Sequence, residues 1–68
     1  GGLIHDQLSD REYQIMCMMA SGKTQTQIAE ELALSVKTIS TYRARILAKT
    51  GLKSNAEITR YAIENKLV

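Results

Sequence analysis

An all-α fold, a four-helix bundle that contains a helix-turn-helix, is the fold class that this sequence predicts. Helix-start signals recur along the chain, each a Ser or Thr followed three positions later by Glu or Gln. Between these signals the apolar residues repeat with helical spacing, and no segment alternates as a strand does. The expected helices cover about residues 10–21, 25–32, 36–50 and 55–65.

The helix boundaries follow from caps and glycines. The first helix starts after Ser9, with Leu8 as the apolar residue before the cap, and ends at Gly22; Ser35 caps the third helix, which ends before Gly51. The capping boxes that we predict pair Ser9 with Glu12, Thr24 with Gln27 and Ser54 with Glu57. The inner faces of the first two helices are predicted to hold Ile15, Met16, Met19, Ile28, Ala29 and Leu32.

Residues 1–7 show no periodicity, and we interpret them as a linker or cloning remnant in which His5 has no role. The remaining residues, 8–68, form one domain, because a chain of this length buries only about 60% of its unfolded surface and needs a compact core. With a single cysteine there is no internal disulfide, so packing alone must stabilise the fold.

Composition argues against several functions. One His, one Cys and the lack of a Cys/His cluster predict no metal site and no cofactor, and no paired carboxylates or phosphate-cradling loop suggest an enzyme. No apolar run approaches the roughly 20 residues of a membrane span, so no membrane partner is expected. The lone thiol and the lack of a signal peptide favour the cytoplasm.

Charge is distributed unevenly along the chain. Residues 1–34 hold two basic and five acidic side chains, a net charge of −3, whereas residues 35–68 hold seven basic and two acidic ones, a net charge of +5. Between Ser35 and Ser54 there are five basic residues and no acidic one. This asymmetry indicates a polyanionic partner.

The predicted third helix has two different faces. Its core side is expected to hold Ile39, Tyr42, Arg43, Ile46 and Thr50, with Leu47 at the margin. The opposite side is small, polar and basic, whereas a merely solvated face more often mixes Glu with Lys. It consists of Lys37, Ser40, Thr41, Ala44, Arg45 and Ala48. We therefore predict that the helix from Ser35 to Gly51, braced by residues 25–32, enters the major groove of double-stranded DNA.

The chain resembles the LuxR/FixJ-type (GerE-like) output domain, the C-terminal part of many bacterial two-component response regulators. The resemblance covers about 60 residues and depends on the order and spacing of its anchors: Leu8-Ser9, Arg11-Glu12, Ala20 with Gly22, Ile28-Ala29, Leu34-Ser35, Lys37-Thr38-Ile39, Ile46, Lys49 and Glu57. It implies base contacts from Ser40, Thr41 and Ala44. It implies phosphate contacts from Lys37, Thr38, Tyr42, Lys49 and Thr26, to which we add Arg43 and Arg45.

Two positions depart from the family pattern. Thr50 stands in the core stripe where the family usually has Leu or Met, so we expect loose packing there. Thr26 stands where lysine is common, which removes one phosphate contact. Because the base-facing side chains are small, we expect modest direct readout, with affinity dominated by phosphates and dependent on salt and DNA shape.

The fourth predicted helix carries two apolar stripes, one with Ile58, Tyr61 and Ala62 and an opposite one with Ala56 and Ile63. The resemblance implies homodimerisation through this helix, and the interface that we predict consists of Ala56, Thr59, Arg60 and Ile63. Promoter or operator DNA and RNA polymerase are the other candidate partners. Two alternatives stay open: the promoter-recognition region of a sigma factor, and a helical protein-interaction module without DNA binding.

Overall fold

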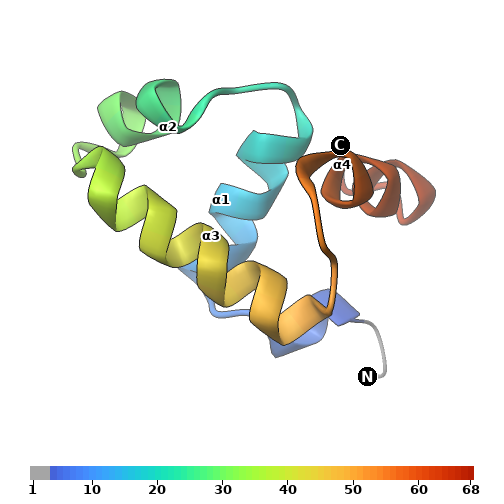
Figure 1. The fold of residues 1–68 in the computed structure, drawn as a ribbon. Coiled ribbons are helices and arrows are strands. Elements are labelled where there is room, and N and C mark those ends of the chain that lie inside the picture. Colours follow the sequence, from blue (N-terminus) through green and yellow to red (C-terminus); the bar gives the residue numbers. More distant parts are fainter. Residues whose placement is uncertain (1–3) are drawn as a thin grey trace.

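The computed structural model describes residues 4–68, which form a short 3-10 helix and four α-helices (Figure 1). These are η1 (Ile4–Gln7), α1 (Asp10–Ala20), α2 (Gln25–Leu32), α3 (Val36–Thr50) and α4 (Asn55–Glu64). The described residues contain no strand, so the predicted all-α fold is confirmed. Residues 1–3, which belong to the predicted linker, lie outside the described residues.

The capping boxes at α1 and α2 are formed as predicted. Ser9 Oγ accepts a hydrogen bond from the Glu12 N–H at 3.2 Å, and the Glu12 carboxylate accepts one from the Ser9 N–H at 2.8 Å. Thr24 and Gln27 exchange the same pair of bonds at 3.1 and 2.8 Å. Each box satisfies two of the backbone donors that a helix start leaves unpaired, which fixes where these helices begin.

The predicted capping box at α4 is wrong in one of its two bonds. Ser54 Oγ does accept from the Glu57 N–H at 3.2 Å, but Glu57 Oε1 accepts from the Lys53 N–H, at 3.2 Å, instead of from the Ser54 N–H. Ser54 has a φ of −154°, compared with −68° at Ser9. This more extended backbone brings the preceding amide, rather than the Ser54 amide, to the Glu57 carboxylate.

The turn between α2 and α3 has three residues. Ala33 takes the left-handed conformation with a φ of 57°, and the Leu34 N–H then donates to the Ala29 carbonyl at 2.9 Å. The next residue, Ser35, already caps α3 through a 3.0 Å bond from the Thr38 N–H. The chain therefore changes direction within one tight turn, and α2 meets the start of α3 (Figure 1).

The core lies around α1, which packs against α2, α3 and α4. Fully burying one of its large side chains stabilises the fold by about 1.5–3 kcal/mol relative to leaving that side chain exposed. The predicted inner residues of α1 and α2 are buried, except for the half-buried Leu32. The largest fully buried side chains come from all four α-helices: Ile15, Met16, Ile28, Ile39, Ile46 and Ile58.

Residues 4–7 are folded onto the domain, and the prediction that His5 has no role is wrong. The His5 ring lies 5.5 Å from the Tyr13 ring and 5.8 Å from the Tyr61 ring, measured between centroids. Its Nδ1 is 2.7 Å from the Tyr61 hydroxyl, which also accepts from the His5 backbone N–H at 3.2 Å. Because this segment shows no periodicity, the sequence did not predict the long-range contact of His5 with Tyr61, which joins η1 to α4.

Thr50 is buried, with 8% of its surface exposed, and its hydroxyl has two backbone partners; the expectation of loose packing there stays a prediction. Its hydroxyl donates to the Ile46 carbonyl at 2.7 Å and accepts from the Leu52 N–H at 3.3 Å. No buried side-chain polar atom within residues 4–68 lacks a partner. The hydroxyl therefore connects the last turn of α3 to the chain that leaves it.

Candidate nucleic-acid interface

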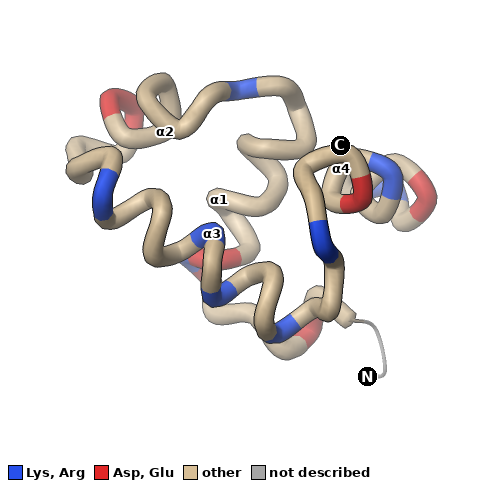
Figure 2. Tube along the Cα trace, in the orientation of Figure 1, with Lys and Arg blue, Asp and Glu red and all other residues tan. Residues whose placement is uncertain are grey.

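The two faces of α3 are arranged as the sequence predicts. Ile39, Ile46 and Thr50 are buried, and Tyr42, Arg43 and Leu47 are half-buried at the margins. All six residues of the predicted outer face are exposed: Lys37, Ser40, Thr41, Ala44, Arg45 and Ala48. Figure 2 shows basic positions along α3 and into the segment after it, with acidic positions on α2 and α4 and none on α3.

Ser40 is tied to α2. Its hydroxyl donates to Oε1 of Gln25, the first residue of α2, at 2.8 Å. Gln25 is half-buried and was not among the predicted site residues. Sequence reasoning missed it because it carries no charge and lies outside the apolar stripe of α2; its position at the start of the bracing helix was the available signal.

Thr41 and Lys37 are linked within the outer face. The Thr41 hydroxyl donates to the Lys37 carbonyl at 3.2 Å, so its hydrogen is already used. The groups left for a partner are the hydroxyl lone pairs and the methyl group, which suits a thymine methyl. Lys37 itself is exposed and takes part in no ion pair within the described part of the chain.

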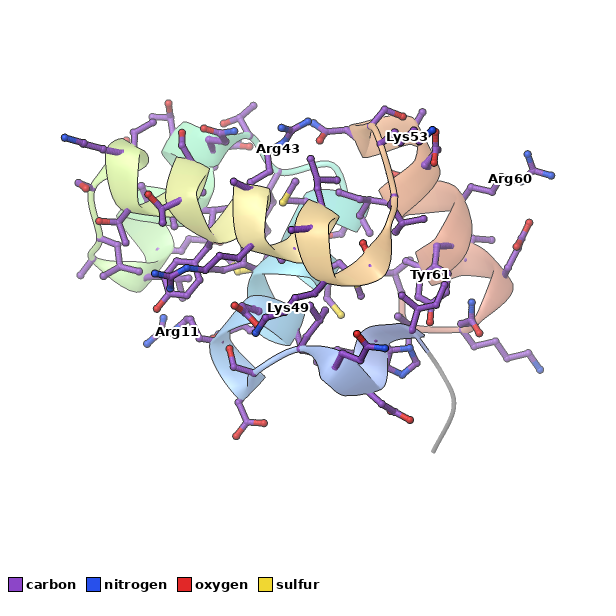
Figure 3. The ribbon with its side chains drawn as sticks, turned by 60° about the horizontal axis from the view of Figure 1, so that its bottom comes forward. Arg11, Arg43, Lys49, Lys53, Arg60 and Tyr61 are labelled. Carbon is purple, nitrogen blue, oxygen red and sulfur yellow. The ribbon has the colours of Figure 1, made fainter. Side chains whose placement is uncertain are left out.

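Both arginines of α3 have intramolecular partners. Arg43 reaches the start of α4, where its Nε donates to Asn55 Oδ1 at 3.0 Å (Figure 3). The guanidinium of Arg45 lies 5.8 Å from the centre of the Tyr42 ring, a distance typical of a cation–π contact. Arg43 thus joins two helices, while exposed Arg45 stays available on the outer face.

Lys49 forms an ion pair with Glu12. Its ammonium lies 2.8 Å from Glu12 Oε1, and Figure 3 shows Lys49 on the side of α3 that faces α1. The Glu12 residue is only 3% exposed. The hydrogen bonds from Lys49 and from the Ser9 backbone hold the pKa of this carboxyl below its ordinary value, against the opposite effect of burial. The lysine that we predicted on a phosphate therefore has a partner within the domain.

The sequence contained a signal for this ion pair. Glu12 lies three and four positions before Ile15 and Met16, which places it on the buried stripe of α1. A carboxylate on such a stripe requires a charged or hydrogen-bonding partner. We predicted only the capping box between Glu12 and Ser9, and not the ion pair between Glu12 and Lys49.

The remaining predicted phosphate contacts lie near helix starts. Thr26 is exposed in the first turn of α2, and Thr38 is half-buried in the first turn of α3, where its hydroxyl is 2.9 Å from Ser35 Oγ. The unpaired N–H groups and the dipole of a helix start attract anions. Both threonines are thus at positions where a phosphate is favoured.

The outer side of α4 is exposed in the manner that the dimer prediction requires. Ala56, Arg60 and Ile63 are exposed, and Thr59 is half-buried. Ile63 leaves 61% of its surface exposed, the largest fraction among the large apolar residues that the structure describes. Its neighbour Arg60 forms an exposed ion pair with Glu64 at 3.0 Å, a type of pair that contributes little to stability.

The domain thus has an eight-residue helix and a 15-residue helix joined by a three-residue turn, and the longer helix has a basic outer face without acidic residues. This arrangement defines a helix-turn-helix DNA-binding domain. Residues 6–62 match the family described as bacterial regulatory proteins, luxR family. The chain therefore belongs to the luxR family, whose members regulate transcription and are not enzymes.

Curated relatives agree with this assignment. The chain is 39% identical over 66 residues to the transcriptional regulatory protein LiaR of Bacillus subtilis (strain 168), covering 97% of this chain and 31% of that protein. It is 43% identical over 61 residues to the oxygen regulatory protein NreC of Staphylococcus aureus (strain JH9), covering 90% of this chain and 28% of that protein. The chain spans less than a third of the length of these relatives.

The family membership decides between the interpretations of the sequence. It favours the LuxR-type domain over a sigma-factor region and over a protein-interaction module without DNA binding. Within residues 4–68, no helix combines the length and apolar character that crossing a membrane requires.

Proposed function

We propose that this domain binds double-stranded DNA sequence-specifically, with α3 in the major groove, as the C-terminal effector domain of a response-regulator transcription factor. The observation that carries the proposal is the outer face of α3, which is exposed over six positions and carries two basic residues and no acidic one. Its other four side chains, two of them alanines, are small enough to let the helix backbone approach the bases.

The contacts divide into two kinds. Ser40, Thr41 and Ala44 meet base edges, and the phosphates on the groove walls are bound by Lys37, Thr38, Tyr42, Arg43, Arg45, Lys49 and Thr26. Lys37 and Arg45 are the main electrostatic contacts, because both are exposed and neither is paired with a described carboxylate. Arg43 and Lys49 contact phosphates only by sharing or leaving Asn55 and Glu12.

Two domains bind one operator as a homodimer through α4. The exposed Ile63, with Ala56, Thr59 and Arg60 on the same helix, supports this arrangement because it offers an apolar contact that the monomer leaves uncovered. A symmetric pair places two copies of α3 on half-sites about 34–36 Å apart along the DNA. Each domain then needs to distinguish base sequences only modestly at its own half-site.

The whole protein acts in the cytoplasm, and residues 1–7, of which Ile4–Gln7 fold onto this domain as η1, lead to an upstream receiver domain. Support comes from the longer relatives, which are named regulatory proteins and of which this chain matches less than a third. Promoter DNA and RNA polymerase are the partners of such a regulator.

Selection of binding sites from random DNA, performed with this domain at two salt concentrations, tests the proposal. We expect an enriched site with two related halves and an affinity that falls steeply with salt. Lys37→Gln should weaken all sequences alike and reduce the salt slope by about one, whereas the matched charge change Lys66→Gln, on a residue after α4, should leave binding unchanged. No enrichment, or equal effects of both variants, would contradict the proposal.

A further inference from the structure

We propose that Gln25 is a specificity-determining residue that sets the direction of the Ser40 hydrogen bond, so that Ser40 meets its base as an acceptor. In the same arrangement the Gln25 side-chain amide donates to a DNA phosphate. The inference rests on the proposed function, because it concerns the DNA that α3 reads.

The hydrogen bond between these residues bridges the two helices of the helix-turn-helix. Ser40 Oγ donates to Gln25 Oε1 at 2.8 Å, across 15 positions of sequence. Gln25 is half-buried at the first position of α2, which packs directly on α3, while Ser40 is exposed on the outer face. Because α2 packs on α3, the two side chains are already within hydrogen-bond distance before any DNA arrives.

A serine hydroxyl has one hydrogen to donate and two lone pairs that accept. Because the Ser40 hydrogen is used by Gln25, what Ser40 offers to the groove is acceptor capacity. In the major groove the donors are the amino groups of adenine N6 and cytosine N4, whereas guanine O6 and N7 and thymine O4 accept. Ser40 therefore favours A or C over G or T on the strand that it contacts.

The side-chain nitrogen of Gln25 can still donate hydrogen bonds. Its nitrogen carries two N–H donors, and none of the side-chain hydrogen bonds found within residues 4–68 uses them. The adjacent residue, Thr26, is exposed in the same first turn, where the helix dipole favours an anion. A phosphate oxygen is the acceptor that fits both the charge and the position.

The two roles are separated by two substitutions of Gln25. Gln25→Ala removes the acceptor, so the Ser40 hydrogen becomes free to donate and the preference for A or C at one position should fall about fivefold, the order of one neutral hydrogen bond. Gln25→Glu keeps an acceptor for Ser40 but replaces the donors by a negative charge. It should therefore retain the base preference and lower the affinity for all sequences by about tenfold or more.

The experiment measures competition among duplexes that vary at each position of the best selected site, for wild type, both Gln25 variants, Ser40→Ala and the double variant. Ser40→Ala should abolish the preference at that position, and adding Gln25→Ala should change it no further. A purely structural role for Gln25 would alter the melting temperature without moving base preference. Circular dichroism melts of each variant therefore accompany the binding data.

The outcomes distinguish this inference from the proposed function. If the wild type selects a site and Gln25→Ala keeps the same preference, the inference is wrong and the function stands. A wild-type preference for G or T at the Ser40 position also overturns the inference. If the wild type selects no site at all, both fail.

Discussion

The Glu12 carboxylate and the Lys49 ammonium lie 2.8 Å apart, joining the first turn of α1 to the last turns of α3. The same carboxylate oxygen accepts the Ser9 N–H that begins α1. The two ends of the pair differ in environment, since the Glu12 side chain is 4% exposed and that of Lys49 is 42% exposed. One buried acid thus contacts both the start of α1 and the last turn of α3.

Removing either partner should destabilise the domain, and removing the lysine should cause the larger loss in the free energy of unfolding. Lys49→Met leaves a buried carboxylate with a single donor and should reduce the free energy of unfolding by about 3 kcal/mol. Glu12→Gln keeps an oxygen that can accept from Lys49 but removes the negative charge beside this partly exposed ammonium, and it should reduce the free energy of unfolding by about 2 kcal/mol. Urea denaturation at neutral pH measures both. Equal stability of Lys49→Met and wild type would show that the ion pair contributes nothing.

Acid should destabilise the wild type through Glu12. The pKa of Glu12 is lowered below 4.5 in the folded state, chiefly by the Lys49 hydrogen bond and then by the Ser9 backbone bond. The unfolded chain therefore binds a proton more readily, and the stabilisation is complete above pH 4.5 and lost as the pH falls through the folded pKa. Glu12→Gln should show a flatter loss of stability below pH 4.5 in the same denaturation series. An identical acid profile would assign the acid sensitivity to other carboxylates.

The ion pair also makes a prediction about DNA binding. If Glu12 retains Lys49 in the complex, Lys49→Gln should leave the salt slope of DNA binding unchanged, whereas a phosphate contact would reduce the slope by about one. Lys37→Gln is the matched variant with a predicted phosphate contact, and it should reduce the salt slope of DNA binding. Fluorescence anisotropy titrations from low to moderate salt give all three slopes. A reduced slope for Lys49→Gln would instead support the proposed phosphate contact and show that Lys49 shares or leaves Glu12 in the complex.

Local features of this fold could be predicted from sequence, and specific long-range pairs could not. Ser9 and Ser35 fix helix starts through atoms three residues away, so their signals are visible in a short window. The outer face of α3 likewise follows from periodicity alone. Gln25, Lys49 and His5 instead find partners 15, 37 and 56 positions away. Such pairs depend on how helices pack, which periodicity does not specify.

Thr50, a polar residue in the apolar stripe of α3, uses its hydroxyl to join α3 to the residues that follow it. Thr50→Val keeps the shape of the side chain but removes bonds to the Ile46 carbonyl and the Leu52 N–H, so it should destabilise the domain by about 1 kcal/mol. Chemical denaturation tests this value. Increased stability of Thr50→Val, or of the more apolar Thr50→Leu, would instead support the expectation of a poorly filled position.

The contact between η1 and α4 should be measurable as a coupling energy. Tyr61→Phe removes only the hydroxyl that faces His5, and His5→Ala removes the ring and its aromatic contacts. Each variant should lose about 1 kcal/mol, and the double variant should lose less than the sum because both remove the same bond. Strictly additive losses would show that the two residues act independently.

The exposed apolar residue of α4 gives the sharpest test of dimerisation. Ile63→Glu places a charge in the predicted interface, so DNA-supported dimers should dissociate while the monomer keeps its fold, because Ile63 is 61% exposed. Analytical ultracentrifugation on operator DNA should show one domain per duplex for this variant and two for the wild type. Val68→Glu is the matched control, since Val68 is 55% exposed and lies beyond α4. Equal sedimentation of all three proteins would remove α4 from the interface and require each domain to read its site alone.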